Sequence, residues 1–143
     1  MLDASLGEAD VHYSIIQAIA TGEQTWKNIT QRVGEPSGSV SRPRKWLEEM
    51  QYVARIIPVT ENALTSRRTL YRIVDPYIAF WHRFVAPLLA TGETSLSAAD
   101  VLWAGRVAPG LNDYMGRQFE EMCRAWVGRT TRLPFRPSRV GTW

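Results

Sequence analysis

The first 50 residues carry apolar side chains at the spacing of three short helices. The first helix is predicted to end at Thr21-Gly22, and the second runs from an N-cap at Thr25 to a stop at Gly34. Residues 1–9 precede this pattern and are expected to form a flexible N-terminus. The apolar positions of the two helices, three or four residues apart, are Val11, Ile15, Ile16, Ile19, Trp26, Ile29 and Val33.

A third helix follows the turn at residues 35–38. Because proline fits a helix best in its first turn, where few amide donors are used, Pro43 places the start near Ser39 or Ser41. The positions that cluster on its buried side are Val40, Pro43, Leu47 and Met50.

The hydrophobic period then changes from that of a helix to that of a strand. Residues 52–59 and 69–74 are rich in Val, Ile, Leu and Tyr and flank a polar link at residues 60–68, which predicts a β-hairpin. Three short helices followed by a hairpin are the order of a winged helix-turn-helix, whose third helix enters the DNA major groove. The predicted fold class is therefore mainly α with a small β-hairpin, with this unit at residues 10–75.

Residues 76–128 are predicted to form a helical segment. Asp75 is an N-cap before Pro76, and the broad apolar surface behind it must be buried. A further helix is expected over residues 97–107, ending before Pro109, and a last helix ends at Gly128. The apolar positions of the last helix are Leu111, Met115, Phe119, Met122 and Trp126.

The composition fits a folded chain that does not span a membrane. Of the 143 residues, 45% are apolar and 22% are charged, and the longest apolar stretch is interrupted by His82, Arg83 and Pro87. The first ten residues have no basic start and no long apolar run, so no secretory signal is expected, and a single cysteine, Cys123, agrees with a reducing compartment. We expect a cytoplasmic protein with no membrane partner.

Positive charge is concentrated at the C-terminal end. The net charge is +3, yet residues 124–143 alone hold five arginines and no acidic residue. Residues 129–143 are expected to be an arginine-rich, disordered tail. Arginine binds phosphate through two parallel hydrogen bonds, so nucleic acid is one partner that the composition allows. Genome composition explains high arginine usage equally well.

A surface that contacts duplex DNA is predicted on the third helix and near the tip of the hairpin. Basic side chains at both places would meet phosphates. Against this, Glu48 and Glu49 would repel the DNA backbone, and many winged helices pack on proteins instead. The candidate residues are Ser41, Arg42, Arg44, Lys45, Arg67 and Arg68.

Motifs of the common enzyme classes are absent from the sequence. Lys27 and Lys45 lie outside any Gly-x-x-x-x-Gly-Lys-Ser/Thr loop, so ATP is not bound in that way. His12 and His82 lack a second histidine at helical spacing to form a zinc pair, and Cys123 is by default a buried thiol. We expect no catalytic residue, no metal and no cofactor.

Three stretches of the sequence carry a further signal. Residues 70–85 read LYRIVDPYIAFWHRFV, residues 114–124 read YMGRQFEEMCR, and residues 140–143 read VGTW. They resemble a known family of archaeal and bacterial P-loop ATPases, which carry a winged helix and a C-terminal region named domain of unknown function 234. The first stretch is similar to the junction between these two parts, the second to the next signature, and the third to the start of another.

The resemblance implies the C-terminal part of such a protein, without its ATPase domain. In the family this region looks like a restriction-endonuclease core, and Glu120 matches its helix glutamate. The strands that carry the aspartate and lysine are expected beyond Trp143, which would make this a truncated nuclease-like region. Because one glutamate cannot hold a catalytic metal ion, Glu120 and Glu121 are expected to be solvated or salt-bridged.

The sequence thus predicts a non-catalytic DNA-binding or regulatory module. One alternative is a protein-interaction module that packs on an ATPase partner chain or on a second copy as a homo-oligomer. A truncated remnant of a nuclease-like protein is the other.

Overall fold

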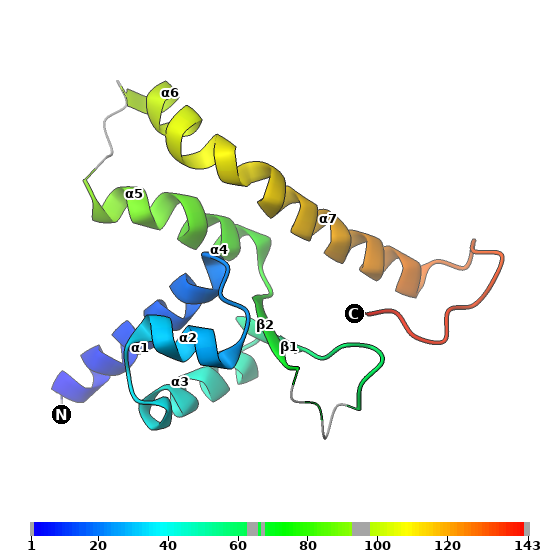
Figure 1. Cartoon of the computed structure of the whole chain (residues 1–143), viewed down its shortest axis with the longest axis horizontal. Helices are drawn as coiled ribbons and strands as arrows, with labels where there is room; N and C mark the ends of the chain where they lie inside the picture. The colour runs from blue at the N-terminus through cyan, green and yellow to red at the C-terminus, as the bar shows by residue number, and fades with distance from the viewer. Residues whose placement is uncertain (1, 63–65, 67, 93–97, 142–143) are drawn as a thin grey trace.

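The computed structural model describes residues 2–62, 66, 68–92 and 98–141, and over these residues the chain is mainly helical with a two-stranded antiparallel sheet. Figure 1 shows α1, α2 and α3 together on one side, the helix that contains α4 and α5 next to them, and the long helix that ends in α7 beyond it. The predicted class, mainly α with a β-hairpin, is therefore confirmed.

The three N-terminal helices and the two strands form the first unit of the structure. Its centre is helix α1 (Leu2–Ala20), which contacts α2 (Trp26–Val33), α3 (Ser37–Glu49) and β2 (Leu70–Ile73). Residues 2–9 are part of α1, whereas the sequence predicted a flexible N-terminus there. The buried core of the unit is apolar and consists of Ile15, Ala18, Ile19, Ala20, Ile29, Val40, Leu47, Val53, Tyr71 and Ile73.

The two predicted ends of α2 are confirmed. The Thr25 hydroxyl accepts a hydrogen bond from the Asn28 amide at 3.3 Å, which satisfies one of the amides that a helix start leaves unpaired. Gly34 closes the helix with φ at 77°, a left-handed conformation that glycine adopts without a steric penalty.

Helix α3 begins at Ser37, earlier than Ser39 or Ser41, so Pro43 lies inside the helix and not in its first turn. Pro43 is buried, so its ring adds apolar contact at the place where it removes a backbone donor. Met50 was expected in the core, but it follows the last residue of α3 and is 54% exposed.

The predicted hairpin is present, with shorter strands than the sequence suggested. β1 (Val53–Ile56) pairs antiparallel with β2, and Val53 lies opposite Ile73. The amide of Tyr71 also donates to the Gln24 carbonyl at 2.8 Å. This bond ties the segment before α2 to β2 and fixes the start of α2 against the sheet.

Asp75 begins the second half of the structure as predicted. Its carboxylate accepts hydrogen bonds from the amides of Tyr77 at 2.7 Å and Ile78 at 3.3 Å. The helix that follows is continuous and consists of α4 (Pro76–Phe80), a π-helical turn η1 (Trp81–Val85) and α5 (Ala86–Ala90).

A second π-helical turn explains why the predicted break before Pro109 is wrong. In η3 (Trp103–Val107) the Ala108 amide donates to the Trp103 carbonyl, five residues back, as the Ala86 amide does to Trp81 in η1. Each turn precedes an Ala-Pro pair, and the wider turn accommodates a proline that would clash in an α-helix. Consequently α6 (Ala99–Leu102), η3 and α7 (Ala108–Arg129) form one helix.

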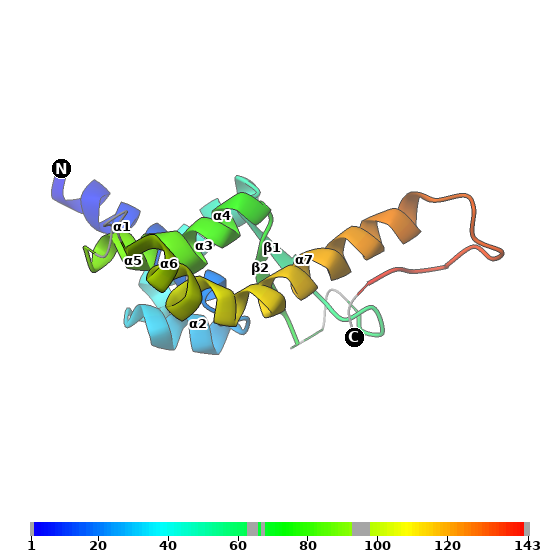
Figure 2. The ribbon, with the colours of Figure 1, turned by 90° about the horizontal axis from the view of Figure 1, so that it is seen from above.

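A small second core joins the two long helices. It consists of Phe84, Val107 and Tyr114, and the Tyr114 hydroxyl donates to the Pro76 carbonyl at 2.7 Å. Tyr114 is the one buried residue among the described side chains of α7. The C-terminal half of α7 extends past the hairpin, as Figures 1 and 2 both show.

The tail that follows α7 is irregular through residue 141 and returns to Val59, in the segment between β1 and β2. The Arg139 guanidinium donates to the Val59 carbonyl at 3.2 Å, and the Gly141 backbone lies against the Val59 side chain. The tail therefore makes contacts with the body, which the sequence did not predict.

Candidate functional site

The exposed side of α3 carries two of the predicted contacts. Arg42 and Lys45 are both exposed, whereas Ser41 is half-buried and its hydroxyl donates to the Ser37 carbonyl at 2.6 Å. Arg42 and Lys45 lie three residues apart and therefore on neighbouring positions of one helix side. The structure thus brings two of the predicted cations of α3 to the surface.

Arg44 faces the interior of the unit. Its guanidinium lies 4.8 Å from the centroid of the Trp26 ring and donates to the Tyr71 hydroxyl at 3.0 Å. Its Nε atom is 3.1 Å from the Glu48 carboxylate, one helical turn further along α3. Glu48 is therefore paired with Arg44, whereas Glu49 is exposed one helical turn after Lys45, and repulsion of a phosphate backbone by these two residues stays a prediction.

At the hairpin, Arg68 is exposed and its Nε atom lies 3.4 Å from the Glu61 carboxylate. Arg67, the other predicted contact here, lies outside the described residues. An exposed ion pair of this kind contributes little to stability, so Arg68 can exchange Glu61 for another anion at low cost.

The basic pocket is a cavity of about 630 Å³ that is lined by four cationic side chains from separate elements. Lys27 comes from the first turn of α2, Arg44 from α3, Arg55 from β1 and Arg68 from the segment before β2. No Asp or Glu is among the described residues that line it. The remaining lining residues are Thr25, Trp26, Pro58, Thr69, Leu70 and Tyr71.

Sequence reasoning missed Lys27 and Arg55. Both are exposed, and neither forms an ion pair with any residue in the described part of the chain. The signal for Arg55 was the register of the hairpin. Arg55 lies opposite Tyr71 in the sheet, and the Tyr71 hydroxyl accepts a hydrogen bond from Arg44. The signal for Lys27 was its place two residues after the N-cap Thr25.

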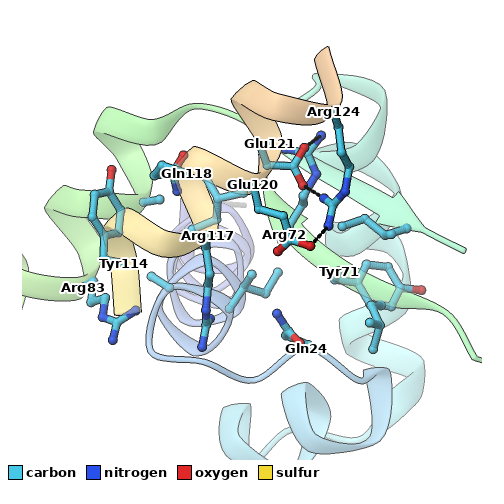
Figure 3. Close-up of a pocket in the computed structure, with 16 residues that line it drawn as sticks. Gln24, Tyr71, Arg72, Arg83, Tyr114, Arg117, Gln118, Glu120, Glu121 and Arg124 are labelled. Carbon is cyan, nitrogen blue, oxygen red and sulfur yellow. Dashed lines mark hydrogen bonds and ion pairs between the residues drawn. The ribbon is translucent and has the colours of Figure 1, made fainter. Parts of the chain in front are cut away.

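A second pocket, of about 310 Å³, lies between α7 and the first unit (Figure 3). Six charged side chains line it, and two of them, Arg83 and Arg117, pair with Asp113, which lies outside the lining. Arg72 of β2 is 3.3 Å from the Glu121 carboxylate, and Arg124 pairs with both Glu120 and Glu121. The expected salt bridges of Glu120 and Glu121 are confirmed, and no cluster of three potential metal ligands occurs among the described residues.

Three groups on the two long helices have shifted pKa values. A hydrogen bond from Arg83, at 2.8 Å, lowers the pKa of Asp113, with Arg117 adding to the effect from 3.2 Å. Burial raises the pKa of the Tyr114 hydroxyl, and burial lowers the pKa of His82. None of these groups lines the basic pocket.

Of the apolar positions of α7, Leu111 packs against the second core, whereas the four that follow are exposed. At 100° per residue its four large side chains fall within an arc of about 60°. Cys123, expected to be buried, is exposed beside them. The side of α7 toward the hairpin carries charged and polar residues instead, including Arg117, Gln118 and Glu121. The exposed apolar residues are Met115, Phe119, Met122 and Trp126, each 54–67% exposed.

Comparison with known proteins supports part of the resemblance. Residues 81–143 match the family model of domain of unknown function 234, described as archaea bacterial proteins of unknown function. Over 139 residues the chain is 27% identical to an uncharacterized protein of Methanocaldococcus jannaschii. This match covers 95% of the chain and 30% of that relative's length. No solved structure matches the chain.

These matches say nothing of an ATPase domain or of a truncated nuclease, so both stay predictions. No helix in the described ranges has the length and apolar character to cross a membrane.

Proposed function

We propose that residues 10–75 form a winged helix-turn-helix unit that binds duplex DNA without catalysing a reaction. Its order of elements, α1, α2, α3 and an antiparallel hairpin, is that of the winged helix. The third helix of such a unit is the one that enters the major groove.

The observation that carries the proposal is the placement of cations on elements that pack against each other. α3 contacts β1, so the exposed Arg42 and Lys45 of α3 and the exposed Arg55 of β1 belong to one rigid unit. Arg68 precedes the partner strand β2. A duplex held against this unit meets positive charge from both the helix and the hairpin.

The proposed contacts are directed at phosphate more than at base edges. Arg42 and Lys45 are long and exposed, and the described part of α3 presents no asparagine or glutamine that would read adenine. Binding is therefore weak and nearly independent of base sequence.

Fluorescence anisotropy with two 20-base-pair duplexes of unrelated sequence tests the proposal. The expected affinities agree within about threefold, and Arg42→Ala with Lys45→Ala weakens both. A charge-matched control, Arg106→Ala with Arg129→Ala on the long helix, leaves the affinity close to that of the wild type. Absence of binding to either duplex at low salt contradicts the proposal.

A second candidate function is protein interaction through the apolar side of α7. Met115, Phe119, Met122 and Trp126 form a continuous exposed stripe of large side chains, which is the composition of an interface core. A second copy of the chain is the occupant that purified protein tests directly. Light scattering of wild type and of Phe119→Glu with Trp126→Glu distinguishes a dimer from a monomer.

A further inference from the structure

The pocket lined by Lys27, Arg44, Arg55 and Arg68 differs in kind from the exposed side of α3. It is a concave site of about 630 Å³ with cations on several of its walls, whereas Arg42 and Lys45 do not line it. A concave site of this charge selects a compact anion, because the four side chains converge on one volume.

Two of the four cations already have partners. Arg44 is paired with Glu48 and Arg68 with Glu61. Lys27 and Arg55 have no ion-pair partner in the described part of the chain, so their charges are available to a ligand. The pocket therefore keeps an unbalanced positive charge after its internal ion pairs are counted.

The start of α2 adds hydrogen-bond donors at the same place. The amides of Trp26 and Lys27 are the first two of the helix and have no acceptor within it. The Thr25 hydroxyl accepts from the Asn28 amide, so its own hydrogen is free to be donated. The bond from Tyr71 to Gln24 holds this helix start against β2, so the donors are fixed in place.

We propose that this pocket binds a phosphate group of a nucleic-acid strand. Lys27 and Arg55 supply the charge, and Thr25 with the start of α2 supplies further hydrogen bonds. Arg44, held by Trp26 and Tyr71, forms the rigid back wall. The inference rests on the proposed function, because it assigns one phosphate of the bound strand to a defined site.

The test uses inorganic pyrophosphate as the probe, measured by isothermal titration calorimetry on the full chain at low ionic strength. Wild-type protein is expected to bind it, and Lys27→Gln with Arg55→Gln is expected to weaken binding at least tenfold. Both residues are exposed, so the variant is expected to melt at the wild-type temperature. The control Arg106→Gln with Arg129→Gln is expected to change the affinity less than twofold.

The same variants separate this proposal from the proposed function. Arg42→Ala with Lys45→Ala should weaken duplex binding and leave pyrophosphate affinity unchanged. Pyrophosphate that does not bind, or binds equally well to Lys27→Gln with Arg55→Gln, overturns the pocket while duplex binding through α3 still stands. If that variant loses pyrophosphate but keeps wild-type affinity for duplex and single-stranded DNA, the ligand is a free phosphate compound and the nucleic-acid assignment is overturned.

Discussion

Arg44 lies over the ring of Trp26, with its guanidinium carbon 4.8 Å from the ring centroid. The same guanidinium donates to the Tyr71 hydroxyl, so one side chain joins α2, α3 and β2. A residue that the sequence suggested as a DNA contact is thus a structural link in the unit that presents the other contacts.

Replacing Arg44 should lower stability. Arg44→Ala removes a cation–π contact and a hydrogen bond to a buried phenol, and it leaves Glu48 unpaired. The expected loss is about 1–3 kcal/mol in the free energy of unfolding by urea denaturation. Arg42→Ala on the exposed side of the same helix should change it by less than about 0.5 kcal/mol. Equal effects of the two substitutions would contradict the placement of Arg44.

Two phenylalanines provide a matched test of the cores. Phe84 is 5% exposed between the long helices, whereas Phe119 is 66% exposed on α7. Phe84→Ala should lower stability by about 3–5 kcal/mol, and Phe119→Ala should change it by less than about 0.5 kcal/mol. A large loss for Phe119→Ala in dilute protein would mean that the apolar side of α7 is covered.

His82 should make stability depend on pH. Its Nδ1 atom lies 3.2 Å from the Gln17 side-chain oxygen, its ring packs near Tyr13, and burial lowers its pKa from 6.5. Because the folded pKa is below the unfolded one, the stabilisation is present above pH 6.5 and is lost as the pH falls through the folded pKa. The melting temperature should therefore fall from pH 7.5 to pH 5, and less so for His82→Gln. An identical decline in both proteins would exclude His82 as the cause.

The tail should contribute little to stability. Its described contacts with the body are the exposed hydrogen bond from Arg139 to Val59 and the packing of Gly141 on Val59. Deleting residues 130–143 should therefore cost about 1 kcal/mol or less, measured by urea denaturation. A larger loss would show that the tail belongs to the fold.

Features set by neighbours in sequence could be predicted. The N-caps Thr25 and Asp75 and the stop at Gly34 depend on side chains within three residues and on the freedom of glycine, and the structure has all three. The hairpin followed from its change of period. Even Pro109 had a local signal, since both π-helical turns end at the valine of the same Val-Ala-Pro sequence.

Features set by distant parts of the chain could not be predicted. Periodicity identified the apolar side of α7 at Phe119 but not whether another element covers it. The basic pocket joins Lys27 to Arg55, which are 28 positions apart in the sequence and meet only because β2 binds the segment before α2. The direction of each side chain decides whether a basic residue of α3 can meet a partner. Arg44 is half-buried, whereas its neighbour Lys45 is exposed.

The salt dependence of duplex DNA binding tests the account most directly. The logarithm of the binding constant should fall linearly with the logarithm of salt concentration, by about 0.9 for each phosphate contact. Arg42→Ala with Lys45→Ala should make this slope shallower by about 1 to 2, and Arg106→Ala with Arg129→Ala should leave it unchanged. A slope that is the same for the wild type and for Arg42→Ala with Lys45→Ala would contradict DNA binding through α3.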